Sequence, residues 1–498
     1  MITVIVPYDQ LSRTHGAMKN AHPDTHEILI IESTSMLSSR TWHAQRLYLL
    51  LSASEHFAAE CEAEGFKVHR VRSESLSSGI QAFVAEHPDH QLVATQPRSR
   101  ALQGSFENLN IQLVNDDSFL TSRAEFHAWA AGRNTLTQEH FYRWQRARLG
   151  YLMDGATPVG GAWNFDQDNR LPPPKPGYLW PTPLTFAVDD IDQATLTKLE
   201  ASDLSLWGTA TLGLWATTRE GALQQLDWFL THSLSAFGPY EDAMPKDSWA
   251  GYHSMLSPYL NLGLLSPQEV CDAAIARFEQ GDVPINSIEG FIRQVIGWRE
   301  YINGVYWLFP EEYQENNALS ANRALLPLFE DSTATKMNCM KSVISDVENR
   351  GWAHHIPRLM LMSNLALLTD VNPQEFLDWM RRSFIDAADW VMVPNVIGMG
   401  LHADHGTMMT KPYVAGGAYI KRMGQFCAGC IYKPTERTGS TACPFTTLYW
   451  DFLDRHQEEF SKNHRMMQQF AGLRKLNDLE DVRARAQEVL TGLEEGTI

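Results

Sequence analysis

The first 115 residues alternate short β-branched runs with longer amphipathic stretches. Strands are predicted at residues 3–7, 28–33, 68–71, 92–95 and 111–114, and the stretch 41–64, which ends at Gly65, is long enough for a crossover helix. Strands separated by helices are typical of a parallel, doubly wound α/β sheet of the Rossmann type. Ligands in such sheets bind at the carboxyl ends of the strands, which here directs attention to Tyr8, Asp9 and Ser33.

From about residue 195 the apolar residues recur at helical spacing, as in Leu223, Leu226 and Leu230. Between about 150 and 190 the pattern breaks into Pro- and Gly-rich stretches that indicate an ordered linker or a long surface loop. We therefore predict an α/β domain over 1–130, an interdomain linker over 131–200 and an all-helical domain over 201–498.

The composition narrows the class of protein. The chain has 498 residues, of which 44% are hydrophobic, and a net charge of −18, so attraction of nucleic acid by the whole surface is excluded and any basic patch is local. The segment 411–437 is the candidate, although a scattered solvated surface would look the same. No apolar run is long enough to span a membrane and no basic leader opens the chain, so we expect a cytoplasmic protein without membrane contact.

Cysteine spacing is the sharpest chemical signal. A C-x-x-C pair at Cys427 and Cys430 is followed by Cys443 and preceded by the distant Cys339. Four thiols can close one site, and this spacing suits an iron–sulfur cluster, which we favour, or a zinc ion. Plain buried thiols are the third alternative, while a redox disulfide of the thioredoxin kind would need a βαβ context that is absent.

Other catalytic signatures fail. The sequence has no phosphate-binding loop, no G-x-S-x-G and no H-E-x-x-H. His354 and His355, beside Trp352 and Arg358, form a second constellation. Adjacent histidines on a helix point to different faces, so one could face a pocket as a proton donor while the other packs. A satisfied core histidine is the alternative.

Several spaced segments carry a resemblance. The run 253–267 resembles the flavin-phosphate segment of the photolyase and cryptochrome family, and the segments 294–300, 352–358 and 384–390 resemble further blocks of that family in the same order. The four cysteines fit its bacterial iron–sulfur branch, whose repair members act on (6-4) photoproducts. The similarity spans essentially the whole chain.

The resemblance implies FAD folded in the helical domain. The residues it assigns to FAD are Tyr240, His253, Ser254, Met255, Leu256, Ser257, Trp298, Arg299, Arg358, Asp386, Asp389 and Asn395. Arg358 is expected to pair with Asp386. Helix capping by the two serines, and a surface salt bridge between Arg358 and Asp386, are the alternatives without a cofactor.

The resemblance also assigns catalytic roles. His355 occupies the place of the histidine that protonates the lesion, and His354 would orient it. Tyr413, Trp298 and Gln294 are candidate lesion contacts. Trp379 occupies the place of the flavin-proximal aromatic of an electron-transfer chain, with Trp390 as an alternative member.

Three accessory groups follow from the resemblance. Cys339, Cys427, Cys430 and Cys443 would hold a 4Fe-4S cluster. Asp9 and Glu32 would contact a 6,7-dimethyl-8-ribityllumazine antenna, which the bulky Arg46 could alter or exclude, and the acidic segment 163–170 could hold Mg²⁺.

We therefore expect a light-dependent enzyme that reverses (6-4) photoproducts in UV-damaged DNA, acting as a monomer. A cryptochrome-like blue-light receptor is the first alternative, and the histidine pair favours repair over it. A light-independent nucleic-acid-binding iron–sulfur protein is the second, because the cysteine region resembles the cluster domain of the primase large subunit. The flavin-phosphate segment argues against it.

Overall fold

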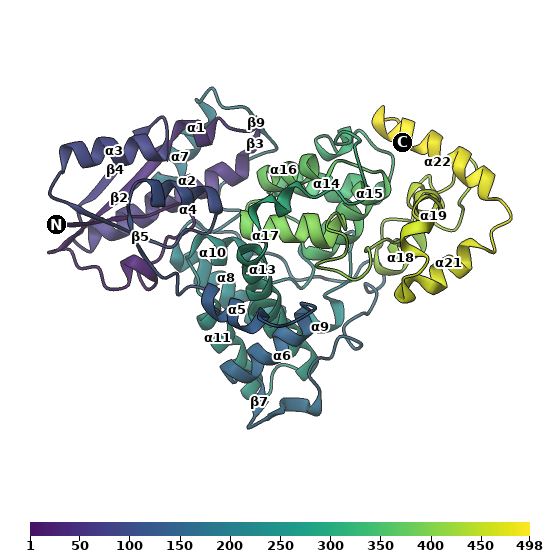
Figure 1. The fold of residues 1–498 in the computed structure, drawn as a ribbon, viewed down its shortest axis with the longest axis horizontal. Helices are drawn as coiled ribbons and strands as arrows, with labels where there is room; N and C mark the ends of the chain where they lie inside the picture. The colour runs from purple at the N-terminus through teal and green to yellow at the C-terminus, as the bar shows by residue number, and fades with distance from the viewer.

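The computed structural model describes residues 1–498 and contains the predicted parallel sheet (Figure 1). Its strands run in the order β4 (Val68–Ser73), β2 (His26–Ser33), β1 (Ile2–Ile5), β5 (Gln91–Thr95) and β6 (Gln112–Val114), and every pair is parallel. All five predicted strands are present, and their ends differ from the prediction by at most two residues. The chain order reverses between β1 and β5, which is the switch point of a doubly wound sheet.

Helices cover both faces of the sheet. On one face Ile5, Leu29 and Ile31 pack with Phe83 of α3 (Leu76–Glu86) and Phe106 of α4 (Arg100–Asn108). On the other face, the buried residues of β1 and β2 pack on α2 (Ala44–Ala63) and share one core with Phe229, Tyr259 and other residues of the helical part. The sheet is therefore joined to the helices by a continuous apolar core.

The predicted crossover helix is slightly shorter than expected, because Trp42 and His43 form a small strand. This strand, β3 (Trp42–His43), pairs in parallel with β9 (Leu206–Trp207) from the other side of the linker. Two-residue strands have no alternating pattern to detect, and for this reason the sequence did not indicate them.

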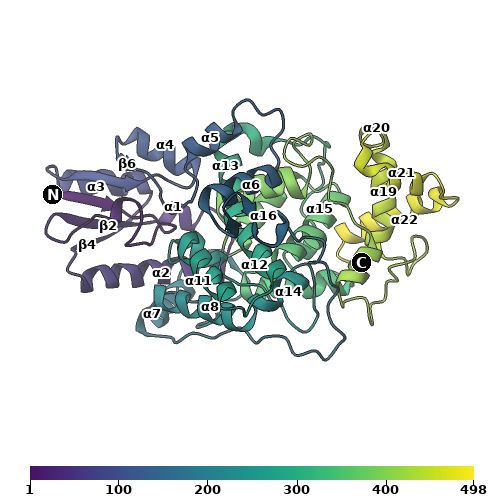
Figure 2. The same cartoon turned by 90° about the horizontal axis from the view of Figure 1, so that it is seen from below.

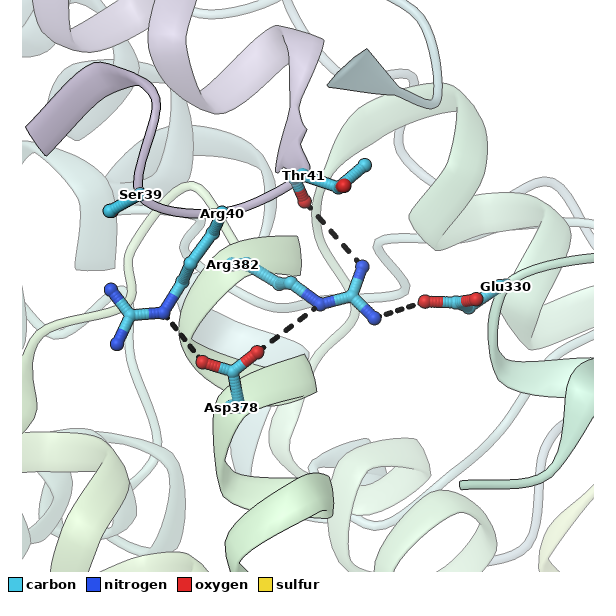
Figure 3. Close-up of a pocket in the computed structure, with 6 residues that line it drawn as sticks. All are labelled: Ser39, Arg40, Thr41, Glu330, Asp378 and Arg382. Carbon is cyan, nitrogen blue, oxygen red and sulfur yellow. Dashed lines mark hydrogen bonds and ion pairs between the residues drawn. The ribbon is translucent and has the colours of Figure 1, made fainter. Parts of the chain in front are cut away.

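Ion pairs beside β3 connect the sheet domain to the helical part. In Figure 3 the carboxylate of Asp378 lies between the guanidinium groups of Arg40 and Arg382. Arg40 Nε donates to Asp378 Oδ1 at 2.5 Å, and Arg382 also pairs with Glu330 and donates to the carbonyl of Thr41. The loop after α1 (Thr34–Leu37) is thereby fastened to α16 (Pro373–Ser383).

Between the sheet and the helical part the chain forms α5 (Arg123–Ala130), α6 (Gln138–Leu149) and a short hairpin of β7 (Met153–Asp154) and β8 (Thr157–Pro158). Residues 162–189 then contain no helix or strand, as the Pro-rich composition predicts. The helical part follows, seen in Figure 2 as the mass beside the sheet. Before it, α7 (Asp190–Glu200) packs on α2 beside the sheet (Figure 1). The helices of the helical part are α8 (Arg219–His232), α9 (Leu234–Tyr240), α10 (Ser257–Leu262), α11 (Pro267–Glu279), α12 (Ile285–Ile292), α13 (Glu300–Leu308), α14 (Asn338–Arg350), α15 (Asn364–Leu368), α16, α17 (Asp389–Val393), α18 (Gly417–Met423), α19 (Pro444–Arg455), α20 (Gln457–Phe460), α21 (Met467–Leu473) and α22 (Leu479–Glu494).

Three segments of this part are π-helical: η3 (Arg293–Arg299), η6 (Pro357–Ser363) and η7 (Pro394–Gly400). Such turns are rare and concentrate at functional sites. None of the helices combines the length and the continuous apolar character that a membrane crossing requires.

Candidate functional site

A cavity of about 770 Å³ opens in the helical part, and all three π-helical segments contribute to its wall. Its size is within the range of protein sites for small molecules and cofactors. The residues expected from the sequence that line it are Ser254, Leu256, Ser257, Gln294, Trp298, Arg299, His355, Arg358, Asp386, Asn395 and Tyr413. Segments that are more than 150 residues apart in the chain therefore meet in one site.

One side of the cavity is built around Asp386. Arg358 donates to both carboxylate oxygens, at 3.0 and 2.9 Å, so the expected pairing is present and bidentate. Ser257 Oγ also donates to this carboxylate at 2.6 Å. Because Arg358 Nε is held by the carbonyl of Ala353 at 2.6 Å, the whole arrangement is fixed before any ligand enters.

Arg299 is a buried cation with unused donors. Its Nη1 pairs with Glu300 at 2.7 Å and its guanidinium lies 4.1 Å from the ring centre of Phe119 and 5.4 Å from that of Trp390. Burial lowers the pKa of Arg299 and raises that of Glu300 to about 7. Nε and Nη2 of Arg299 have no partner, so this part of the wall is suited to an anionic group.

Three histidines cluster on another side of the cavity. The rings of His253 and His354 stack 4.1 Å apart, and His355 lies 5.3 Å from His253. His253 and His354 are buried, and burial lowers both of their pKa values. The His355 side chain is 47% exposed, but it lines the cavity. Burial within the cavity wall, together with the nearby cations Arg358 and Arg293, lowers the pKa of His355 to about 4.

Charged residues that the sequence analysis missed lie at the same cavity. Arg293 is 3.0 Å from Asp166, 3.7 Å from Glu241 and 3.6 Å from Glu289. Burial raises the pKa of Glu241 to about 8 and that of Asp242 to about 6, and Asp242 lies 3.9 Å from His355. Arg293 directly precedes a family block and Glu241 and Asp242 directly follow Tyr240, which is the signal that could have identified them.

The remaining expected FAD residues, Tyr240, His253, Met255 and Asp389, and the orienting His354, do not line the cavity. Tyr240 stacks on Tyr252 at 5.7 Å, while Met255 has a left-handed backbone (φ +56°) that shapes the loop carrying Ser254 and Ser257. Asp389 pairs with Arg381 at 2.8 Å and lines a separate small pocket, so the structure does not bring it to the expected place.

The two candidate tryptophans differ in position. Trp390 lines the cavity, and its Nε1 has no partner. Trp379 is fully buried one layer behind, 5.7 Å from Phe384, with its Nε1 donating to the carbonyl of Phe329 at 2.9 Å. Of these two tryptophans, only Trp390 lines the cavity.

The two candidate antenna residues, Asp9 and Glu32, do not lie in the same pocket. Glu32 lines a pocket of about 410 Å³ beside β2, β4 and α7, where it pairs with Lys198 at 2.6 Å and Arg72 at 3.2 Å. Asp9 is not in this pocket and its carbonyl accepts from Arg98, which fills the switch point of the sheet. Arg46 also lies outside the pocket, because it donates to the carbonyls of Phe384 and Ala387.

The four cysteines gather at the ends of two helices. Cys339 is in the first turn of α14, Cys443 directly precedes α19, and Cys427 and Cys430 lie in the loop between α18 and α19. Burial, together with the neighbouring thiols of Cys443, Cys427 and Cys430, raises the pKa of Cys339. The two other cysteines, Cys61 and Cys271, are buried in the apolar core.

Comparison with known proteins shows the family of this chain. A family model described as deoxyribodipyrimidine photo-lyase-related protein matches residues 4–215. A curated (6-4) photolyase from Agrobacterium fabrum (strain C58) is 38% identical over 505 residues, which cover 99% of both chains. The chain belongs to the photolyase and cryptochrome family.

Solved structures of this family show the same fold. A bacterial class III photolyase from Agrobacterium tumefaciens has a TM-score of 0.57 at 16% identity and covers 99% of this chain and 98% of its own. A cryptochrome from Synechocystis sp. PCC6803 has a TM-score of 0.53 at 15% identity, with 80% and 82% covered. The photolyase and cryptochrome fold is thus the α/β sheet domain joined to the helical part, and the family implies FAD as the cofactor.

Proposed function

We propose that this photolyase repairs (6-4) photoproducts in UV-damaged DNA, driven by light. The observation that carries the proposal is the position of His355, which faces the interior of the same cavity that the expected FAD residues line. The full-length relative named a (6-4) photolyase supports the same function.

The cavity suits FAD. Arg299 offers two unpaired buried donors, and the Arg358–Asp386–Ser257 arrangement fixes a polar wall that needs no ligand for its own stability. Reduced FAD supplies the electron that light excites. Arg299 would hold an anionic part of the cofactor, Asp386 and Ser257 would orient it, and Asn395, whose Nδ2 already donates to Val391, would present its free oxygen.

His355 would act on the substrate side. In the free protein its imidazole is neutral at pH 7, because its pKa is about 4. An anionic DNA phosphate beside the ring would raise this pKa and favour the protonated form that a proton donor needs. His354, which stacks on His253, would fix the orientation of this segment, and Tyr413 would contact the lesion. A lesion must leave the duplex stack to reach such a cavity.

Two further roles follow from the packing. Trp390 would be the aromatic in contact with the cofactor, and Trp379 would relay electrons from behind Phe384. Both rings are buried, which keeps their positions fixed.

We also propose a 4Fe-4S cluster on Cys339, Cys427, Cys430 and Cys443. Cys427 and Cys430 lie in one loop, and Cys339 and Cys443 lie at the N-terminal ends of α14 and α19, so the four thiols come from segments that meet at one place. A zinc ion on the same thiols is the alternative, and iron and acid-labile sulfide analysis distinguishes the two. The helix N-termini at Cys339 and Cys443 favour thiolates.

For the antenna pigment, 6,7-dimethyl-8-ribityllumazine, we propose the pocket that Glu32 lines, which contains neither Asp9 nor Arg46. The segment 163–170 fits Mg²⁺ poorly. Burial alone would raise the pKa of Asp166, but the positive charges of Arg293 and Arg170 outweigh burial, so the pKa of Asp166 is lowered. The same two cations would repel a metal ion. The proposal therefore contains no magnesium.

Substitution of His355 tests the function. His355→Asn should lower the single-turnover repair of a (6-4) oligonucleotide by about 10²- to 10⁴-fold, as loss of a general acid does, while flavin absorption and lesion binding stay near wild type. The control is His127→Asn, on the partly exposed helix α5 outside the cavity. Unchanged repair by His355→Asn would remove the proton-donor role. A flavin-loaded wild-type protein without any repair would instead favour the blue-light receptor.

A further inference from the structure

A second hollow of about 400 Å³, lined by residues of α18 and α19, adjoins the cavity. Figure 1 shows these two helices near the C-terminal end of the molecule. The two share Met360, Lys411, Tyr413 and Tyr419 as lining residues. The far wall of this hollow, here called the aromatic groove, carries the partly exposed rings of Tyr449 and Trp450, 5.1 Å apart. A ligand that leaves the cavity at Tyr413 therefore enters a surface lined by aromatic rings.

The floor of the groove is flat and rigid. It consists of the small residues Ala415, Gly416, Gly417 and Ala418. Buried Asn364 exchanges two hydrogen bonds with the backbone of Ala415, at 2.8 and 3.1 Å, and Thr446 Oγ1 accepts from the amide of Gly417 at 3.1 Å. Gly416 packs against the Tyr449 side chain and Gly417 against Thr446 and Pro434, so the small residues let the wall that carries Tyr449 sit close against the floor.

The rim of the groove is positively charged. In the segment 411–437 the ion pairs are those of Lys433 with Glu436 and of Arg437 with Asp478. Lys411, which lines both hollows, and Arg422, which lines only the cavity, consequently have no carboxylate partner, although the chain as a whole carries a charge of −18. Unpaired cations beside partly exposed aromatic rings are the combination that binds unpaired nucleotides.

We propose that the aromatic groove binds the base of the nucleotide directly next to the lesion, stacked on Tyr449 or Trp450, while Lys411 and Arg422 contact the adjoining phosphates. This inference rests on the proposed function. A lesion that rotates out of the duplex disrupts the stacking of its neighbours, and the groove compensates this loss with a new stacking surface. Because α19 begins directly after Cys443, the proposed cluster would also hold this wall in place.

A double-mutant cycle between protein and DNA tests the proposal. Wild type and Trp450→Leu are titrated with (6-4) duplexes that are intact or lack one base, removed on the 5′ side, on the 3′ side or opposite the lesion. Loss of one stacking contact should weaken binding of the intact duplex by about 5- to 140-fold. Removing the flanking base on one side should abolish this difference between the two proteins, because both changes delete the same contact.

Matched variants keep the test decisive. Trp450→Phe should retain most of the affinity, and Tyr449→Leu repeats the cycle in case Trp450, which packs against Gly472, is needed for folding. Trp144→Leu is the control, because Trp144 is also a partly exposed tryptophan packed on the same core but lies outside both hollows. Purely additive losses at both flanks, or coupling only with the opposite base, would overturn the proposal. Failure of wild type to prefer lesion DNA would instead count against the proposed function.

Discussion

Acid should destabilise this photolyase through His43, at the seam between the sheet and the helical part. The side chain is fully buried, its Nδ1 accepts from the amide of Gln45 at 3.1 Å, and its Nε2 lies 3.1 Å from the carbonyl of Glu348. This arrangement satisfies the neutral ring with the proton on Nε2. A second proton on Nδ1 would meet an N–H group, and burial accordingly lowers the pKa from 6.5 to about 4.

The sign and size of the effect follow from this pKa. The folded protein binds the proton less readily than the unfolded chain, so the penalty is absent above the unfolded pKa of 6.5 and complete below the folded value of about 4. The complete penalty is about 3.4 kcal/mol, and between pH 7 and pH 5 the loss of stability is about 1.8 kcal/mol. His43 contacts the backbone just before the segment 352–358, so the histidine cluster would lose its support as well.

His43→Gln isolates this contribution, because glutamine keeps a donor for the Glu348 carbonyl but cannot be protonated. The free energy of unfolding is measured by urea titration at pH 7 and at pH 5. The variant should start lower at pH 7 and lose about 1.8 kcal/mol less than wild type on going to pH 5. His232→Gln, on a partly exposed histidine of α8, is the control. Equal acid sensitivity in wild type and His43→Gln would refute the reasoning.

Two further substitutions test the cavity wall and the cysteine site. Asp386→Asn leaves Arg358 without a carboxylate partner and should lower the free energy of unfolding, measured by urea titration, by about 3 kcal/mol. It should also weaken flavin retention, measured as the flavin released on gel filtration, and full retention would contradict the role of Asp386. Cys443→Ser should give protein with little iron and little acid-labile sulfide, whereas Cys271→Ser should keep both; about four irons per chain in Cys443→Ser would exclude four-thiolate ligation.

The strands and the long helices could be predicted because their burial is continuous along the sequence. β2 reads as an unbroken apolar run that is covered on both faces, and α14 shows Met340, Val343 and Val347 at helical spacing on one buried side. The Arg358–Asp386 pair is present as the resemblance implied, and the four cysteines come together as their spacing suggested, while the group that they hold stays a prediction.

Expected and observed contacts differ where the place of a residue in the sequence does not determine the direction of its side chain. Asp386 and Asp389 are three residues apart, yet only Asp386 precedes the helix and turns toward Arg358, while Asp389 starts α17 and turns toward Arg381. Arg46 lies on the predicted helix as expected, but it faces the carbonyls of Phe384 and Ala387, more than 330 residues away, instead of a pocket beside the sheet. Contacts of this kind follow from how the two domains pack, and no local pattern encodes them.

The π-helical turns account for a further part of the site that the sequence could not indicate. A regular helix repeats every 3.6 residues, and each π turn inserts one extra residue, so the face of the helix shifts beyond it. Arg299 ends η3, Arg358 lies in the first turn of η6 and Asn395 in the first turn of η7, and all three line the cavity. A periodic pattern that is interrupted three times reads as an irregular helix in the sequence. In the folded protein the same interruptions direct polar side chains into an otherwise apolar bundle, which is the arrangement that a charged cofactor requires.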